Sequence, residues 1–366
     1  GKEALKNQGE EGILVDHLLE KALQGEEVLI EETTFDPVAL LTLFIKRSLA
    51  TLNMQVSLSR AEIFMFTVEE LTPRMVEVLG KVVSGLQLKC RQICFQSHIE
   101  SFYYYMIHQQ AELWKREVFV FEYNEDLKTL RFQCNRHTTP KVVFIEHLDY
   151  PEMKRVAWSE NEAQRMAQQQ ELDAQFGQLC ESCLRETDVS TVFLIGEGFK
   201  EGWTRESLKI LCHNRRVFQG NNLYSKGACY AAMEKLNPQG GTREYVYLGE
   251  DKLKSNIGMK ALRRGEDSYL AILDAGVNWY EARADFDLIL ESGNVLCFTI
   301  TPLTGENIMD KTITLDGLPE RPRCTTRLRI HAEMTAIHTL TLEITDMGFG
   351  ELFKSSGRAW THTLQG

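Results

Sequence analysis

The most restrictive feature of the sequence is a short apolar run that ends directly in a glycine-rich turn. Val192-Phe193-Leu194-Ile195 shows no alternation of apolar and polar residues, which predicts a strand covered on both faces. Gly196 and Gly198 follow at once, and a helix is expected to begin near Thr204. Such a turn between a strand and a helix N-terminus can hold an anion, because free backbone N–H groups point toward it. We therefore expect a central strand of an α/β sheet with a candidate ligand site at its carboxyl end.

A second strand and a second helix follow this turn. Arg216-Val217-Phe218 is expected to be a short strand, and the helix from Leu223 to Met233 carries small residues at Gly227, Ala228, Ala231 and Ala232. Small residues on one helical face let another backbone approach closely.

This order of elements resembles the adenosine-binding segment of the actin and heat-shock-70 (DnaK-type) ATPase superfamily. The matching pieces are Val192–Gly198, the helix after Thr204, Arg216–Gln219 and Ser225–Ala232. Two departures lie where the ligand would be: Glu197 occupies the turn, and Phe199-Lys200 replace a small hydroxyl residue and an arginine. The resemblance implies a vestigial nucleotide-binding segment made of Gly196, Glu197, Gly198, Lys200 and Gly227.

The second phosphate loop of that superfamily, an Asp followed by Gly-Gly-Gly-Thr, has a different composition here. It would follow the buried strand Val118–Phe121, whose expected hairpin partner is Thr129–Cys134. Side chains block the approach that glycines would give a phosphate, and carboxylates repel it. The resemblance thus implies a degenerate phosphate loop, formed by Glu122, Asn124, Glu125 and Asp126. The three carboxylates could instead bind a hard cation, but we favour a polar hairpin turn, so no metal site is expected.

Two further parts of the nucleotide site are expected to be missing. Gly1–Leu23 resembles the Gly-x-x-Ala motif and its sequel, which in the chaperones follow the strands that carry the first phosphate loop. The resemblance therefore implies N-terminal truncation, and a native start at a polar helix is the alternative. The interval between Cys134 and Thr191 is shorter than the matching interval in the chaperones, which holds the subdomain that stacks on adenine. In this chain the interval is expected to hold one helix, from Trp158 to Arg185.

The pattern predicts two domains. Strands at Val28–Ile30, Ile63–Val68 and Ile93–Phe95 alternate with helices, one of which has Asp36 as N-cap and Pro37 at its first position. We expect an actin-like (ribonuclease-H-like) α/β core over residues 1–240, with lobes at about 1–115 and 116–240. Tyr103 to Tyr105 are expected to form a packed helix face rather than a ligand-binding cluster.

After Gly240-Gly241 the sequence changes to short runs of β-forming residues, beginning at Tyr245. Their regular spacing predicts an antiparallel β-sandwich over residues 245–366. Thr314–Arg323 resembles a turn of the chaperone substrate-binding domain, which holds extended peptides.

Composition limits the classes of partner. The chain has 366 residues and a net charge of −11, which argues against a nucleic-acid partner and against an anionic membrane surface. No apolar run is long enough to span a bilayer, and nine scattered cysteines suggest reduced thiols, so we expect a cytoplasmic protein. The resemblance to the chaperones implies a protein or peptide partner.

Three functions are compared. The first is a degenerate bacterial relative of the heat-shock-70 chaperones, a pseudo-ATPase that binds or scaffolds other proteins without a cofactor. The second is an ATP-dependent chaperone that uses ATP and Mg²⁺ and whose first phosphate loop lies outside this chain. The third is an enzyme of the same superfamily, such as a sugar kinase or a polyphosphate hydrolase. We favour the first, because the other two need intact phosphate loops.

Overall fold

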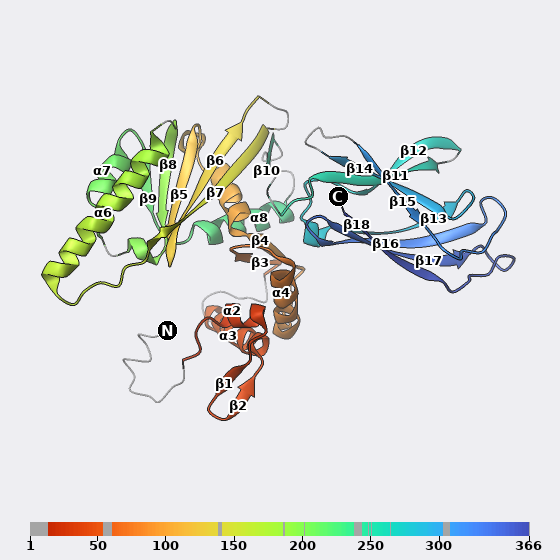
Figure 1. Ribbon diagram of the computed structural model, residues 1–366, viewed down its shortest axis with the longest axis horizontal. Helices are drawn as coiled ribbons and strands as arrows, with labels where there is room; N and C mark the ends of the chain where they lie inside the picture. The colour runs from red at the N-terminus through yellow and green to blue at the C-terminus, as the bar shows by residue number, and fades with distance from the viewer. Residues whose placement is uncertain are drawn as a thin grey trace. The chain divides into compact units, whose positions relative to one another are not determined.

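The computed structural model describes residues 14–53, 61–137, 141–185, 187–200, 202–237, 244–247, 249, 251–263, 265–302 and 308–365. The chain divides into two compact units, residues 1–98 and 99–366 (Figure 1). The division falls at the start of α5 (His98–Ile107), whereas the expected lobe boundary was near residue 115. Helix α5 packs with the second unit because Phe102 and Met106 are fully buried in its core.

The first unit contains helices, a small hairpin and a parallel strand pair. Its elements are α2 (Leu18–Gln24), β1 (Val28–Ile30), β2 (Thr33–Phe35), α3 (Pro37–Asn53), β3 (Ile63–Val68), α4 (Pro73–Leu86) and β4 (Gln92–Ser97). Strands β3 and β4 pair in parallel, with α4 as the crossover between them. The predicted start of α3 is confirmed, since the Asp36 carboxylate accepts hydrogen bonds from the amides of Val38 and Ala39. The first half of the expected Gly1–Leu23 motif lies outside the described residues.

The second unit begins with a six-stranded mixed sheet. Its strands are β5 (Glu117–Tyr123), β6 (Asp126–Asn135), β7 (Lys141–Lys154), β8 (Val189–Ile195), β9 (Arg216–Gln219) and β10 (Tyr245–Tyr247), in the order β10-β7-β6-β5-β8-β9 (Figure 1). Strands β5, β8 and β9 are parallel, and β6 is antiparallel to both β5 and β7. The expectation of a mixed α/β sheet is confirmed.

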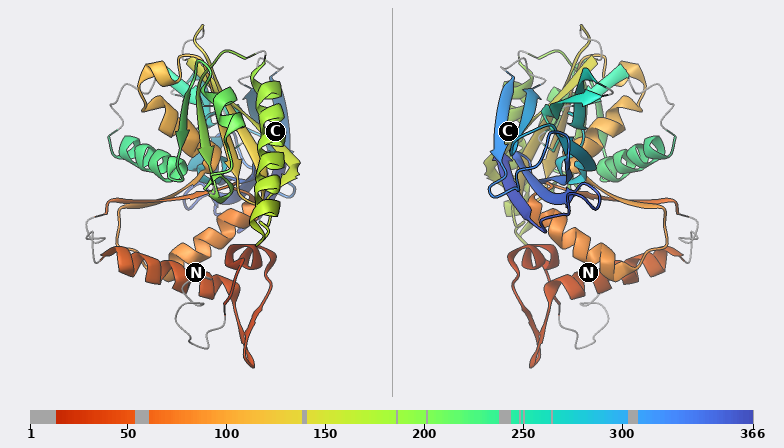
Figure 2. Two further views of the ribbon diagram at one scale, coloured as in Figure 1. Left: turned by 90° about the vertical axis from the view of Figure 1, so that its left-hand side faces the viewer. Right: turned by 90° about the vertical axis from the view of Figure 1, so that its right-hand side faces the viewer.

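Helices cover both faces of this sheet. Figure 2 shows α6 (Glu162–Leu184) and α7 (Glu206–Cys212) on one face, and α5 and α8 (Leu223–Leu236) on the other. Successive side chains of β5 point to opposite faces, so Phe119 and Phe121 pack under α6 while Val118 and Val120 pack under α5. All seven residues of β8 are buried, and β8 lies between β5 and β9. The sequence prediction of a central strand covered on both faces is therefore confirmed.

Tyr245–Tyr247 corrects the expected start of the sandwich. This run forms β10, which pairs in parallel with β7 at the edge of the mixed sheet. The reason is a tertiary contact that the sequence does not reveal. The ring of Tyr247 stacks on Tyr103 of α5 with 5.4 Å between centroids, and the Tyr103 hydroxyl donates a hydrogen bond to the Tyr245 carbonyl.

Two four-stranded antiparallel sheets follow (Figure 1). One has the order β12-β11-β14-β15 and the other β13-β16-β17-β18. The strands are β11 (Ser255–Arg263), β12 (Glu266–Leu273), β13 (Arg283–Leu290), β14 (Val295–Pro302), β15 (Met309–Thr314), β16 (Thr326–Ala336), β17 (Thr339–Gly348) and β18 (Ala359–Gln365). Ile257 and Ile300 of the first sheet and Leu340 and Leu364 of the second line one shared cavity, so the two sheets face each other. The chain is thus mixed α/β followed by β structure, as the sequence predicts.

Among the described helices, none combines the length and apolar character needed to cross a membrane.

Candidate functional site

The structure brings together the two turns that the sequence analysis selected. Strands β5 and β8 are parallel neighbours, with Glu122 opposite Ile195 in the register. Their carboxyl ends therefore lie at the same edge of the sheet, and the Asn124–Glu125 turn lies beside Gly196–Gly198. Residues about 70 positions apart in the sequence meet here, at the edge where open α/β sheets bind ligands.

Two backbone N–H groups of the glycine-rich turn, those of Gly196 and Glu197, already have acceptors within the protein. The Gly196 amide donates to Asn221 Oδ1, and the Glu197 amide donates to Asn124 Oδ1, both over 3.2 Å. Asn124 comes from the β5–β6 turn, and Asn221 lies between β9 and α8. Two side-chain amide oxygens thus occupy the donors that an anion would use.

The faces of both glycines are covered by Tyr123. A Cβ atom on Gly196, whose φ is 102°, would lie 2.4 Å from the Tyr123 carbonyl oxygen. A Cβ on Gly198 would lie 2.4 Å from Cδ1 of the Tyr123 ring. No side chain tolerates these separations, so both positions need glycine for packing within the protein. A bound ligand is not required to explain them.

An aromatic cluster fills the space next to the turn. Tyr123, Phe176, Phe199 and Trp203 are all buried, and their ring centroids lie 5.3 to 6.0 Å apart in the contacting pairs. The Trp203 indole donates a 2.7 Å hydrogen bond to the Gly198 carbonyl. Phe199, which lies where the resemblance would place a small hydroxyl residue, is buried and part of the core.

The residues of the expected degenerate phosphate loop form a polar hairpin turn. Glu122 accepts hydrogen bonds from the Tyr224 hydroxyl at 2.6 Å and from Asn124 Nδ2 at 2.9 Å. The Asn124 amide donates to the Asp126 carbonyl across the turn, and the Glu125 side chain is exposed. In the part of the chain that the structure describes, no group of three His, Cys, Asp or Glu residues could hold a metal ion.

Lys200 and Gly227 have contacts of a different kind. Lys200 forms an ion pair with Glu197, and both side chains are about half exposed, at 54% each. Gly227 packs against α5, where a Cβ on it would lie 1.8 Å from the Ser101 carbonyl oxygen. The small residue thus brings α8 and α5 into backbone contact, as its position on the helix predicts.

The expected tyrosine packing is also observed, since Tyr103 is buried and Tyr105 lies edge-on to Phe193.

The helix after the turn begins at Glu206, close to the expected start near Thr204, and a side chain from another helix caps it. Asp173 of α6 accepts hydrogen bonds from the amides of Arg205, Glu206 and Ser207 and from the Ser207 hydroxyl. Burial by itself would raise the pKa of Asp173, but these hydrogen bonds outweigh it and hold the pKa below its usual value. The amide groups at the start of α7 are consequently occupied by a protein carboxylate.

Sequence reasoning missed the four residues that close this site: Tyr123, Asp173, Asn221 and Tyr224. One signal was available for Asn221: an asparagine two residues after the end of β9 has to lie at the same sheet edge as Gly196, because β8 and β9 are parallel. The other three act through contacts between distant segments.

Comparison with known families gives two matches. Residues 1–250 match the model described as "Family of unknown function (DUF5716) C-terminal", and residues 252–365 match "Domain of unknown function (DUF8552)". No curated protein matches the chain.

Proposed function

The chain belongs to the DUF5716 family of unknown function, and from the contacts at the β5–β8 edge we propose that it is a nucleotide-independent member of the actin and heat-shock-70 superfamily. In this proposal the α/β part is a pseudo-ATPase core that no longer binds ATP. The protein works by binding or scaffolding a protein or peptide partner, and the β-sandwich is the part that resembles a peptide-binding domain.

One observation carries the proposal: protein groups occupy the place of the ligand. Asn221 and Asn124 accept the hydrogen bonds of the Gly196 and Glu197 amides, and Tyr123 covers both glycines. A nucleotide phosphate would have to displace two amide oxygens and an aromatic side chain before it could reach the backbone. Each lost hydrogen bond costs on the order of 1 kcal/mol net, and this cost weakens the binding of a phosphate.

The charges at the same edge also disfavour a nucleotide. Glu122 and Glu125 lie where the resemblance places glycine N–H groups. Two unit charges about 4 Å apart repel by on the order of 4 kcal/mol at an effective dielectric of about 20. That energy corresponds to roughly three powers of ten in a dissociation constant.

The topology supports the resemblance to the superfamily core. A β5–β6 hairpin, the parallel strands β8 and β9, and a helix with glycine at its crossing point follow in the expected order. Between β7 and β8 the described residues contain a single helix, α6, which agrees with a reduced adenine-side subdomain. The ATP-dependent chaperone is the alternative proposal, and it needs this edge to open.

Calorimetric titration of ATP with Mg²⁺ into the protein tests the proposal. We expect no saturable heat, which corresponds to a dissociation constant of about 1 mM or weaker. A heat-shock-70 chaperone titrated under the same conditions is the positive control. A micromolar dissociation constant would instead favour the ATP-dependent chaperone.

A further inference from the structure

A second polar depression lies at the opposite edge of the mixed sheet. Strands β5, β8 and β9 are parallel, so their amino ends meet at the edge away from the Gly196 turn. A cavity of about 350 Å³ opens there, and three arginines line it: Arg116, Arg215 and Arg216. We call it the arginine pocket. Strand β8 spans seven residues, roughly 23 Å at about 3.3 Å per residue, which separates the two sites.

Hydrogen bonds fix the strand ends next to the arginine pocket. The hydroxyls of Ser190 and Thr191 in β8 both donate to the Leu113 carbonyl over 2.7 Å. The Glu117 amide donates to the Asp188 carbonyl over 3.1 Å, which joins the starts of β5 and β8. Because these strand ends are fixed, the backbone near the pocket loses less conformational entropy when a ligand binds.

The three guanidinium groups differ in the ion pairs and hydrogen bonds that they form within the protein. Arg116 forms a 2.6 Å ion pair with Asp188, and Arg215 donates from Nη1 to the Ile210 carbonyl at 3.2 Å. Arg216 is exposed and forms no ion pair among the described residues. Each guanidinium has five N–H donors, so most donors in the pocket remain available.

The charge balance of the pocket is opposite to that of the whole chain. The three arginines face two carboxylates, Asp188 and the lining residue Glu112, which leaves one positive charge uncompensated. The protein as a whole carries a net charge of −11. Like charges held in one depression repel each other, and a bound anion relieves that repulsion.

We propose that the arginine pocket binds a small multivalent oxyanion, either a phosphate-bearing molecule or a polycarboxylate. Guanidinium forks match the planar edges of carboxylates and the oxygen pairs of phosphates, and they bind both in a bidentate way. The volume lies in the range of small-molecule sites. This proposal is independent of the proposed function, because it concerns the other edge of the sheet.

The test uses two probes that separate the two sources of oxyanion. Pyrophosphate and citrate are titrated separately into the protein by calorimetry, with sodium chloride adjusted to constant ionic strength. We expect one of them to bind saturably at one site with a dissociation constant below about 1 mM. The tighter probe identifies the ligand as phosphate-like or carboxylate-like.

Two variants locate the binding. Arg216→Gln and Arg116→Gln should each weaken binding of that probe at least tenfold, while circular dichroism and the thermal unfolding midpoint confirm that they fold. Arg165→Gln is the matched control, because Arg165 is exposed on α6 and does not line the pocket. The Arg165→Gln variant should bind the probe with the dissociation constant of the wild type. The proposal is overturned if neither probe saturates by about 10 mM, or if the two pocket variants bind as the control does.

Discussion

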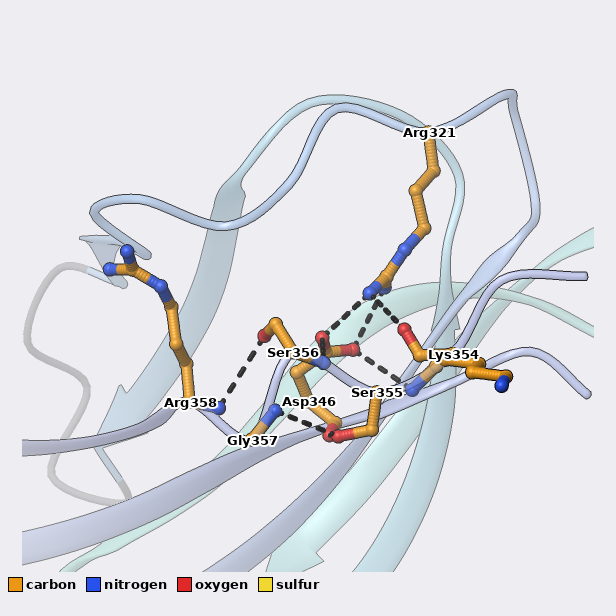
Figure 3. A network of polar contacts seen from close by, with 8 residues as sticks. Arg321, Asp346, Lys354, Ser355, Ser356, Gly357 and Arg358 are labelled. Atoms are coloured by element: carbon orange, nitrogen blue, oxygen red, sulfur yellow. Dashed lines mark hydrogen bonds and ion pairs between the residues drawn. The ribbon is translucent and has the colours of Figure 1, made fainter. Parts of the chain in front are cut away.

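Arg321, which lies between β15 and β16, forms a bidentate ion pair with Asp346 of β17 (Figure 3). The Nη1–Oδ1 distance is 2.8 Å and the Nη2–Oδ2 distance is 2.7 Å. Both side chains are nearly inaccessible, at 6% and 0% exposure. Asp346 also accepts hydrogen bonds from the amides of Gly348 and Ser356, and Arg321 donates to the Lys354 carbonyl. The pair therefore fixes both ends of the segment that connects β17 to β18.

Replacing Asp346 by Asn should destabilise the protein strongly. The substitution leaves the Arg321 guanidinium buried without a counter-charge, which typically costs about 3 to 5 kcal/mol. Urea unfolding followed by tryptophan fluorescence measures the loss. Asp287→Asn is the matched control, because its ion pair with Arg329 is exposed and should contribute little. Equal unfolding curves for the two variants would show that burial of the Arg321–Asp346 pair does not change its contribution to the free energy of unfolding.

The same pair predicts how stability depends on pH. Hydrogen bonds from Arg321 hold the pKa of Asp346 well below its usual range, despite its burial. An aspartate with a lowered pKa stabilises the folded state fully above its unfolded-state pKa of about 3.9, and this stabilisation is lost as the pH falls further. Urea midpoints should therefore begin to drop below about pH 4 and continue to drop as the pH falls toward the folded-state pKa of Asp346. The Asp346→Asn variant should show a smaller drop, and an unchanged drop would contradict this assignment.

Gly198→Ala should destabilise the free protein. The new methyl group would lie 2.4 Å from the Tyr123 ring, and such overpacking typically costs about 1 to 3 kcal/mol. The thermal unfolding midpoint measures the effect in the absence of any nucleotide. Gly220→Ala is the control, since a Cβ there meets no atom within 4 Å. If Gly198→Ala unfolds like the control, then Gly198 is not required for packing.

Gly227→Ala should have a larger effect. Its methyl group would meet the backbone carbonyl of Ser101 at 1.8 Å, so α5 and α8 would have to move apart, at a cost of about 3 kcal/mol or more. Cys229→Ala on the exposed side of the same helix controls for general effects on α8 and should unfold nearly as the wild type. Thermal unfolding by circular dichroism distinguishes the two. A tolerated Gly227→Ala would show that the close helix crossing is not needed for stability.

Features that depend on local chemistry could be predicted from the sequence. Asp36 and Pro37 define the start of α3, because a cap needs only the side chain and the next few amides. The unbroken apolar run of β8 predicts burial on both faces, and the glycine in α8 predicts a close helix crossing. The alternating residues of β16 likewise predict an antiparallel sheet with one buried face.

Features that depend on contacts between distant segments could not be predicted from the sequence. Asp173 caps a helix that begins 33 residues later, and Tyr247 joins the mixed sheet through its stacking on Tyr103. Whether Gly196 and Glu197 offer their amides to a ligand is decided by Asn221 and Asn124, which come from two other turns. The sequence by itself determined most of the strands, helices and turns, because those preferences are local. Only the tertiary structure decided that the glycine-rich turn is closed, because side chains from separate segments meet there only in the folded protein.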